Sequence, residues 1–217
     1  MRTKEQFAEQ VAAVRQNIIE TAFRVFAQRG IEAVSLPEIG RQSGLSRASV
    51  YRYFSSKQEL AVAVSAWSWG NYLQELRART PEDSLRELTA AEHLDWYLDI
   101  FLDLYRNHRD LLRFNQFFNI FYYDVAFNKE QIEPYLDLIQ TIKAGFHAIY
   151  SKAEADGSLK TEYSEETMVS AVIHLMLAAV TRYAVGLVYV SGTDDALENE
   201  LLILKRSLLR EFVREKE

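Results

Sequence analysis

A run of basic, hydroxyl and aromatic side chains between residues 47 and 57 has the chemistry to bind a nucleic acid. An arginine can donate two parallel hydrogen bonds to the edge of a guanine, and a small apolar side chain can contact the methyl group of a thymine. Hydroxyl groups and a lysine suit phosphate oxygens. The residues with these properties are Arg47, Ala48, Ser49, Tyr51, Arg52 and Lys57.

Two short helices are predicted to carry this run. Ser35 followed by Glu38 is typical of a capping box, and Pro37 falls in the first helical turn, where its missing N–H costs nothing. Gly44 ends this helix and Ser46 caps the next one. Two helices joined by a short turn that contains glycine form a helix-turn-helix, whose second helix enters the major groove of DNA.

The second helix is predicted to have a buried face and an exposed face. Val50 and Phe54 are four residues apart and are expected to face the core together with Ile39 and Leu45. The arginines and Tyr51 then lie on the opposite face. Spacing alone leaves an alternative open, which is an ordinary helical hairpin with a solvated polar surface.

The charge distribution favours a nucleic-acid partner for the N-terminal part. Residues 1–57 contain nine Lys and Arg against five Asp and Glu, a net charge of +4. The remaining residues contain sixteen against twenty-six, a net charge of −10, so the two parts sum to the −6 of the whole chain. This asymmetry is typical of a basic DNA-binding head attached to a body that does not bind DNA.

The sequence offers no recognisable catalytic, metal or cofactor site. It has no cysteine, which excludes thiolate zinc sites and fits a reducing, cytoplasmic location. None of the four histidines has a glutamate three residues earlier, and no HExxH, GxSxG or glycine-rich phosphate loop occurs. Residues 168–190 approach membrane-span length, but they contain His174 and Arg182. We therefore expect a buried interface helix and no membrane partner.

The whole chain is predicted to be all-α, with about nine helices. Apolar residues recur at intervals of three and four nearly everywhere, and the chain has only three prolines and eight glycines. The expected helices cover residues 4 or 11–29, a short helix from 36, a second carrying 47–54, then 57–79, 82–107, 110–127, 131–156, 165–190 and 195–216. The expected helix over 82–107 contains another capping box, at Thr89 and Glu92, that could interrupt it.

The N-terminal quarter resembles the TetR family of transcriptional regulators. The resemblance rests on residues 15–30, on Gly44-Leu45-Ser46, on the segment 50–54 (Val-Tyr-Arg-Tyr-Phe) and on the segment 57–60 (Lys-Gln-Glu-Leu). It implies a homodimeric, helical, ligand-responsive DNA-binding protein, usually a repressor, that binds a pseudo-palindromic operator.

Position by position, the resemblance implies that Arg47, Ala48, Ser49 and Arg52 face bases or backbone. It also implies that Ser35, Tyr51, Tyr53 and Lys57 hold phosphates. Two residues depart from the family pattern. Gly40 stands where alanine is usual and is expected to weaken its helix by about 1 kcal/mol, and Pro37 makes a base contact from the first helix doubtful.

The residues from 96 to 127 are rich in aromatic side chains, with eleven in thirty-two residues. An aromatic stripe at helical spacing is typical of a core, and the family resemblance adds a pocket for an apolar or aromatic small molecule. If the acidic stripe of Asp95, Asp99 and Asp103 lined this pocket, a cationic ligand would be favoured. The predicted ligand-binding residues are Trp96, Phe101, Phe114, Phe118, Tyr122, His147 and His174.

The last two predicted helices have the pattern of a dimerisation unit. Small residues in the first would allow close helix approach, and leucines in the second recur at near-heptad spacing. Two such hairpins would form a four-helix bundle about a two-fold axis, although both helices could instead be buried within one subunit. The predicted interface residues are Val180, Tyr183, Ala184, Leu187, Leu201, Leu204 and Leu208.

These observations predict two domains, a helix-turn-helix DNA-binding domain over residues 1–56 and a helical ligand-binding and dimerisation domain over residues 57–217. Two further hypotheses remain. One is a DNA-binding regulator of the same fold without a small-molecule ligand. The other is a helical small-molecule-binding protein whose head no longer reads DNA.

Overall fold

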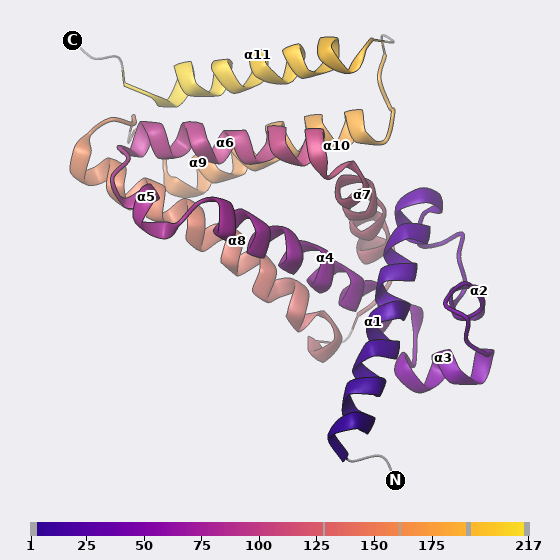
Figure 1. Ribbon diagram of the computed structural model, residues 1–217. Coiled ribbons are helices and arrows are strands. Elements are labelled where there is room, and N and C mark those ends of the chain that lie inside the picture. Colours follow the sequence, from indigo (N-terminus) through magenta and orange to yellow (C-terminus); the bar gives the residue numbers. More distant parts are fainter. Residues whose placement is uncertain (1–3, 128, 161, 190–191, 215–217) are drawn as a thin grey trace. The chain divides into compact units, whose positions relative to one another are not determined.

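The computed structural model describes residues 4–127, 129–160, 162–189 and 192–214 and confirms the all-α fold over them (Figure 1). An isolated antiparallel bridge between Leu159 and Val213 is the β-type pairing found among these residues. The helices are α1 (Lys4–Arg29), α2 (Leu36–Gln42), α3 (Arg47–Tyr53), α4 (Lys57–Arg79), α5 (Glu82–Arg86), α6 (Ala90–Asn107), α7 (Arg109–Asp124), α8 (Lys129–Asp156), α9 (Glu165–Val172), the π-helical turn η1 (Ile173–Leu177), α10 (Ala178–Ala184) and α11 (Asp194–Phe212).

The chain folds into two compact units that are not consecutive in sequence. One unit combines the chain up to Tyr72 with Arg113–Leu138, and the other combines Leu73–Leu112 with the chain from Ile139 onward. The helices α4, α7 and α8 therefore each begin in one unit and end in the other. This division by packing differs from the division by function predicted at residues 56 and 57, which stays a prediction.

The first unit is built around one face of α1. Burial begins at Ile18 and continues through Ala22 and Phe26, whereas Phe7 and Val11 remain exposed, so the first turns of α1 are helical but extend beyond the core. The core is completed by residues from α2, α3, α4 and α7, including Ile39, Val50, Phe54, Leu60, Phe114 and Phe118, all of them fully buried.

A buried polar contact joins α4 and α7 in the same unit. The indole Nε1 of Trp69 on α4 donates a hydrogen bond to Oδ1 of Asn115 on α7 at 3.3 Å, and both residues are buried. A buried indole N–H that lacks an acceptor has lost its hydrogen bond to water without replacement. This pair therefore fixes the register of α4 against α7.

The second unit contains α6 packed against α10 and α11. The predicted helix over 82–107 is divided into α5 and α6, and the capping box at the start of α6 is confirmed. The Thr89 amide donates to Glu92 Oε2 at 2.8 Å, and the Glu92 amide donates to Thr89 Oγ1 at 3.3 Å. The predicted helix over 165–190 ends earlier, at Ala184, and contains the π-helical turn η1.

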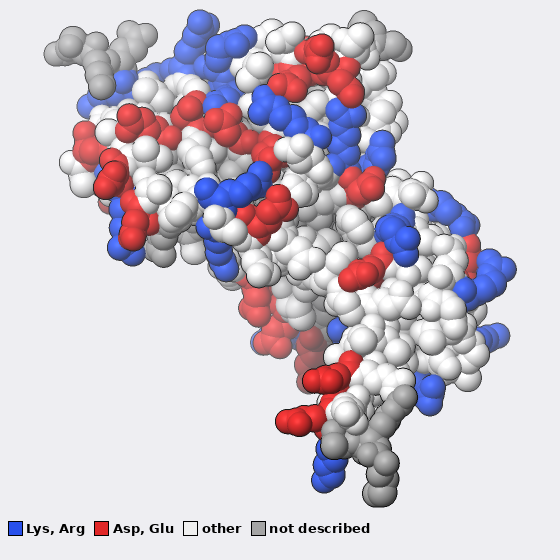
Figure 2. All heavy atoms as spheres, viewed as in Figure 1, with Lys and Arg blue, Asp and Glu red and all other residues white. Residues whose placement is uncertain are grey.

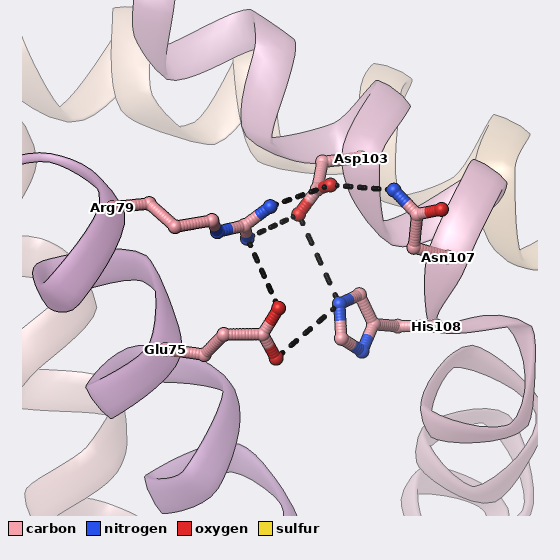
Figure 3. A network of polar contacts seen from close by, with 5 residues as sticks. All are labelled: Glu75, Arg79, Asp103, Asn107 and His108. Atoms are coloured by element: carbon pink, nitrogen blue, oxygen red, sulfur yellow. Dashed lines mark hydrogen bonds and ion pairs between the residues drawn. The ribbon is translucent and has the colours of Figure 1, made fainter.

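The acidic stripe on α6 is paired with cations of the same unit. The ammonium of Lys205 lies 2.9 Å from Asp95 Oδ1 and 2.6 Å from Asp99 Oδ1. Asp103 accepts two hydrogen bonds from Arg79, at 3.1 and 2.8 Å, and a third from Asn107 (Figure 3). Because each of these carboxylates already has a cationic partner within the unit, the stripe does not support the idea of a cationic ligand.

The segment Glu165–Ala184 is long and apolar enough to cross a membrane by length and composition alone. A core helix meets the same criterion, so this observation is weak evidence for a membrane span.

Replacing Asn115 by alanine should lower the free energy of unfolding by about 1–3 kcal/mol, because the buried Trp69 indole would lose its acceptor. Asn119→Ala provides the matched control on the same helix, because its exposed side chain accepts only a long, 3.4 Å hydrogen bond from the Tyr135 hydroxyl, and it should lower stability by less than about 1 kcal/mol. Urea denaturation of both variants measures the difference. Equal losses for the two variants would contradict a role for the buried pair.

Candidate nucleic-acid interface

The helix α2 begins where the sequence predicts, but only half of the expected capping box forms. The Oγ of Ser35 accepts a hydrogen bond from the Glu38 amide at 3.4 Å, so the serine acts as the cap. The Glu38 carboxylate instead pairs with Arg29 at the end of α1. The ion pair therefore ties the start of α2 to α1.

The turn between α2 and α3 depends on two glycines. Gly44 has a φ of +73°, a conformation that side chains with a β-carbon adopt at a cost. Gly40 is buried, and a β-carbon at its position would lie 3.2 Å from Cβ and Cγ1 of Val50. The absence of a side chain at Gly40 thus has a packing consequence as well as the expected propensity cost, since it lets α2 approach α3 closely.

The helix α3 is held by its apolar face, as predicted. Val50 and the C-cap residue Phe54 are completely buried, and Ile39 of α2 packs in the same core. The Oγ of Ser46 caps the helix by accepting from the Ser49 amide at 3.2 Å. The Arg15 guanidinium of α1 lies over the Phe54 ring, 4.8 Å from its centroid.

The opposite face of α3 is open to solvent. Arg47, Ala48 and Arg52 are exposed, and Tyr51 is 42% exposed. The Arg47 guanidinium lies 5.9 Å from the centroid of the Tyr51 ring, so the two side chains share one patch of surface. Figure 2 shows basic side chains along the outer edge of the region that α2 and α3 occupy. This face carries positive charge and groups able to contact bases.

A surface groove of about 490 Å³ lies beside this face. It is lined by the segment that connects α1 to α2, by the starts of α2 and α4, and by α3 through one side chain. It brings together three of the predicted phosphate-binding residues, namely Ser35, Tyr51 and Lys57. Tyr53, the fourth, is only partly exposed and packs against the core.

The structure adds groove residues that sequence reasoning did not identify. Ser55, Ser56 and Gln58 also line the groove. The Ser56 Oγ accepts from the Glu59 amide at 3.1 Å, while the Glu59 carboxylate accepts from the Ser55 amide at 2.8 Å. The sequence signal that could have identified these residues is the cluster of polar side chains at the start of α4. The first amides of a helix attract anions, so polar residues beside them are candidates for phosphate contacts.

The predicted ligand-binding residues are divided between the two units. Phe114 and Phe118 are fully buried in the core of the first unit, and Tyr122 stacks on Phe118 with a centroid distance of 6.3 Å. In the second unit, Phe101 is buried against Tyr97.

The other three lie at or near the surface of the second unit. Trp96 is half-buried against His93. His147 and His174 are exposed, with their Nδ1 atoms 2.9 Å from Glu165 and 3.2 Å from Ser170. A pocket formed by all seven predicted residues stays a prediction.

Several of the predicted interface residues are buried inside the second unit itself. Val180, Ala184, Leu201 and Leu208 are buried there, which agrees with the alternative that these side chains pack inside one subunit. Leu187 is 59% exposed, and Leu204 and Tyr183 are partly exposed.

Tyr183 also has a polar partner within the unit. Burial and the hydrogen bond to Glu200 raise the pKa of Tyr183 to about 12, so its hydroxyl remains a donor to that carboxylate.

A sequence profile described as "Bacterial regulatory proteins, tetR family" matches residues 18–64, the segment that contains the helix-turn-helix. Over this segment, the chain carries a DNA-binding domain similar to that of the TetR family. Two curated relatives are similar to the chain over longer segments. The HTH-type transcriptional repressor KstR2 of Mycolicibacterium smegmatis is 28% identical over 60% of this chain and 65% of its own length. The HTH-type transcriptional regulator AcrR of Shigella flexneri is 32% identical over 40% of each chain.

The chain covers less than two thirds of the length of these relatives: 65% of KstR2, 40% of AcrR and 33% of a third relative, the regulator YerO of Bacillus subtilis.

Solved structures show the same fold over almost the whole chain. A bacterial regulatory protein of the tetR family from Rhodococcus RHA1 superposes with a TM-score of 0.71 at 18% identity, covering 94% of this chain and 98% of that one. The regulator FadR of Bacillus subtilis, solved in complex with stearoyl-CoA, gives a TM-score of 0.65 at 18% identity over 90% and 95% of the two chains.

Replacing Gly44 by alanine should lower the free energy of unfolding by about 1–2 kcal/mol, since the new β-carbon meets no atom within 4 Å and the cost is that of the positive φ alone. The matched control is Gly70→Ala on α4, an exposed helical position with open space around it. This control should gain about 1 kcal/mol from helix propensity. The two variants are compared by urea denaturation, and changes of the same sign would contradict this description of the turn.

Proposed function

We propose that this chain is a homodimeric, sequence-specific DNA-binding regulator of transcription that represses its target promoter. The observation that carries the proposal is the division of α3 into a buried and an exposed face. Val50 and Phe54 anchor the helix, and Arg47, Ala48 and Tyr51 stand on its open side. A helix held in this way can enter the major groove of an operator and act in the cytoplasm on chromosomal DNA.

The groove beside α3 supports a path for the DNA backbone. Ser35 and Tyr51 offer hydroxyl groups there, and the positive end of the helix dipole at the start of the 23-residue helix α4 attracts phosphate oxygens. In this arrangement, backbone contacts set the position of the head and α3 supplies the sequence preference.

A second copy of the chain is the proposed partner in solution. The heads of a two-fold dimer bind two half-sites of a pseudo-palindromic operator. Exposed apolar side chains on the last helices of the second unit support such a contact, namely Leu175 on η1, Leu187 after α10 and Ile203 on α11. These residues extend the interface prediction beyond the side chains that the unit buries internally.

An apolar small molecule is the proposed effector that releases the operator. The solved structure of FadR with stearoyl-CoA supports this, because it places a long acyl chain on a protein of the same fold. The effector must bind better to the conformation that cannot hold the operator, since only a difference in affinity shifts the equilibrium. The helix α4 begins at the head and ends in the second unit, where Arg79 pairs with Asp103, so we assign the signal to this helix.

A regulator of the same fold without a small-molecule ligand is the second candidate. One observation favours it, which is the complete burial of Phe114 and Phe118 in the core of the first unit. These aromatic side chains act there as packing.

The proposal is tested by selecting bound sequences from a random duplex library with the full-length chain. A pseudo-palindromic consensus is the expected result. Recovery of unenriched sequences would favour a helical protein whose head no longer reads DNA.

The double variant Arg47→Ala with Tyr51→Ala should bind the selected duplex at least about thirtyfold more weakly, because each lost contact costs about 1–3 kcal/mol. The matched control is Arg77→Ala with Tyr123→Ala, two exposed residues on α4 and α7. Fluorescence anisotropy measures affinity, and analytical ultracentrifugation should show the dimer of both variants intact. An unchanged affinity of the α3 variant would rule out α3 as the recognition helix.

A further inference from the structure

The first unit carries a second surface groove, which is lined by none of the predicted site residues. This groove has a volume of about 520 Å³ and lies between α1, α4 and the start of α8. All of its lining residues belong to the first unit, and it shares none of them with the groove beside α3. A volume of this size can hold a small organic molecule.

The apolar part of the lining is fixed by the core of the unit. Ile19 of α1 and Val62 of α4 are each 3% exposed, and Ala66 presents only a methyl group to the groove. Trp67 is half-buried and packs edge-on against Phe23, with a centroid distance of 5.6 Å. An indole that is supported on one side by the core and open to solvent on another can pack against a flat apolar ligand.

The polar part of the lining carries more negative than positive charge. Glu59 and Glu130 line the groove, and Arg15 is the cation among the described lining residues. The Arg15 guanidinium is already placed over the ring of Phe54, 4.8 Å from its centroid. Glu130 is exposed at the start of α8 and has no hydrogen-bond or ion-pair partner among the residues that the structure describes. This carboxylate therefore favours a ligand with a positive charge.

Glu59 connects this groove to the groove beside α3. Its Oε2 accepts hydrogen bonds from the Ser55 amide at 2.8 Å and from the Ser55 hydroxyl at 2.7 Å, and Ser55 lines the groove beside α3. A cation that pairs with Glu59 competes with these two donors for the same carboxylate. A ligand in one groove can therefore loosen the start of α4 at the edge of the other.

We propose that the groove between α1, α4 and α8 is a binding site for a small organic cation, with a flat apolar body and an ammonium group. The body packs against Val62 and Trp67, and the ammonium pairs with the carboxylates of the lining. Through the contact between Glu59 and Ser55, the bound cation weakens the binding of DNA beside α3. This last step rests on the proposed DNA-binding function, whereas binding of the cation does not depend on it.

Tryptamine, an indole with an ammonium group, is the probe, and tryptophol is the neutral compound of similar shape. Titration of the isotope-labelled full-length chain without DNA should shift the amide and indole signals of Trp67 with a Kd of about 1 mM. The indole signal of Trp96, in the second unit, is the internal control. Tryptophol should bind about two- to fivefold more weakly, because it cannot form the ion pair. An unshifted Trp67, or equal affinities for the two compounds, would overturn the proposal.

Two pairs of variants locate the site. Glu130→Gln should weaken tryptamine binding about two- to fivefold and leave tryptophol unchanged, whereas Glu133→Gln, exposed on α8 outside the groove, should alter neither. Ala66→Leu fills the groove and should abolish the binding of both compounds, while Ala78→Leu, at an exposed position of α4, should not. Urea denaturation checks that the variants fold. Unchanged tryptamine binding in folded Ala66→Leu, or in Glu130→Gln, contradicts the assignment of the site.

The effect on DNA is measured with the duplex that the wild-type chain selects. Saturating tryptamine should weaken binding of this duplex about two- to fivefold, because the Ser55 hydrogen bonds to Glu59 are lost. Glu130→Gln at the same tryptamine concentration should show a smaller loss, which controls for contact between the probe and the duplex itself. An unchanged affinity, or an equal loss in both proteins, would rule out the coupling. If no duplex is selected, the proposed function fails while the titration of Trp67 still decides the binding site.

Discussion

The exposed face of α3 depends on the burial of its other face. Val50 and Phe54 are completely buried, and α3 has only seven residues, far fewer than an isolated helix needs in water. Its position is therefore set by packing against α1, α2 and α4. The close contact between Gly40 and Val50, and the Arg29–Glu38 ion pair, keep α2 in the place that this packing requires.

The helix α4 is tied at each end to the unit in which that end lies. Near its start, Lys57 bonds to the connector before α2. Near its end, Arg79 pairs with Asp103 on α6, and Glu75 lies 3.7 Å from His108 at the α6–α7 junction (Figure 3). Polar contacts of this kind have definite geometry, so each end of α4 is held in place within its own unit.

The elements that local chemistry specifies could be predicted from the sequence. The bounds of α4 follow from Ser56 before it and Pro81 after it, and the start of α6 follows from Thr89 and Glu92. The turn at Gly44 and the buried face of α3 were predicted for the same reason. Each of these features depends on residues within about one helical turn of one another.

The partners of side chains across the fold could not be predicted in this way. Lys57 meets Ile31 and Glu32 some twenty-five residues earlier, and Lys205 meets Asp99 from a separation of 106 residues. Helical periodicity shows that Phe114 and Phe118 share a face, but it does not show that this face belongs to the core of the first unit.

The central claim is that the exposed face of α3 contacts DNA, and amide chemical-shift mapping of the full-length chain with its selected duplex tests it most directly. The account predicts the largest shifts at Arg47, Ala48 and Tyr51, with smaller ones along the groove at Ser35 and Gln58. Shifts confined to other surfaces, with α3 unaffected at saturating duplex, would contradict it.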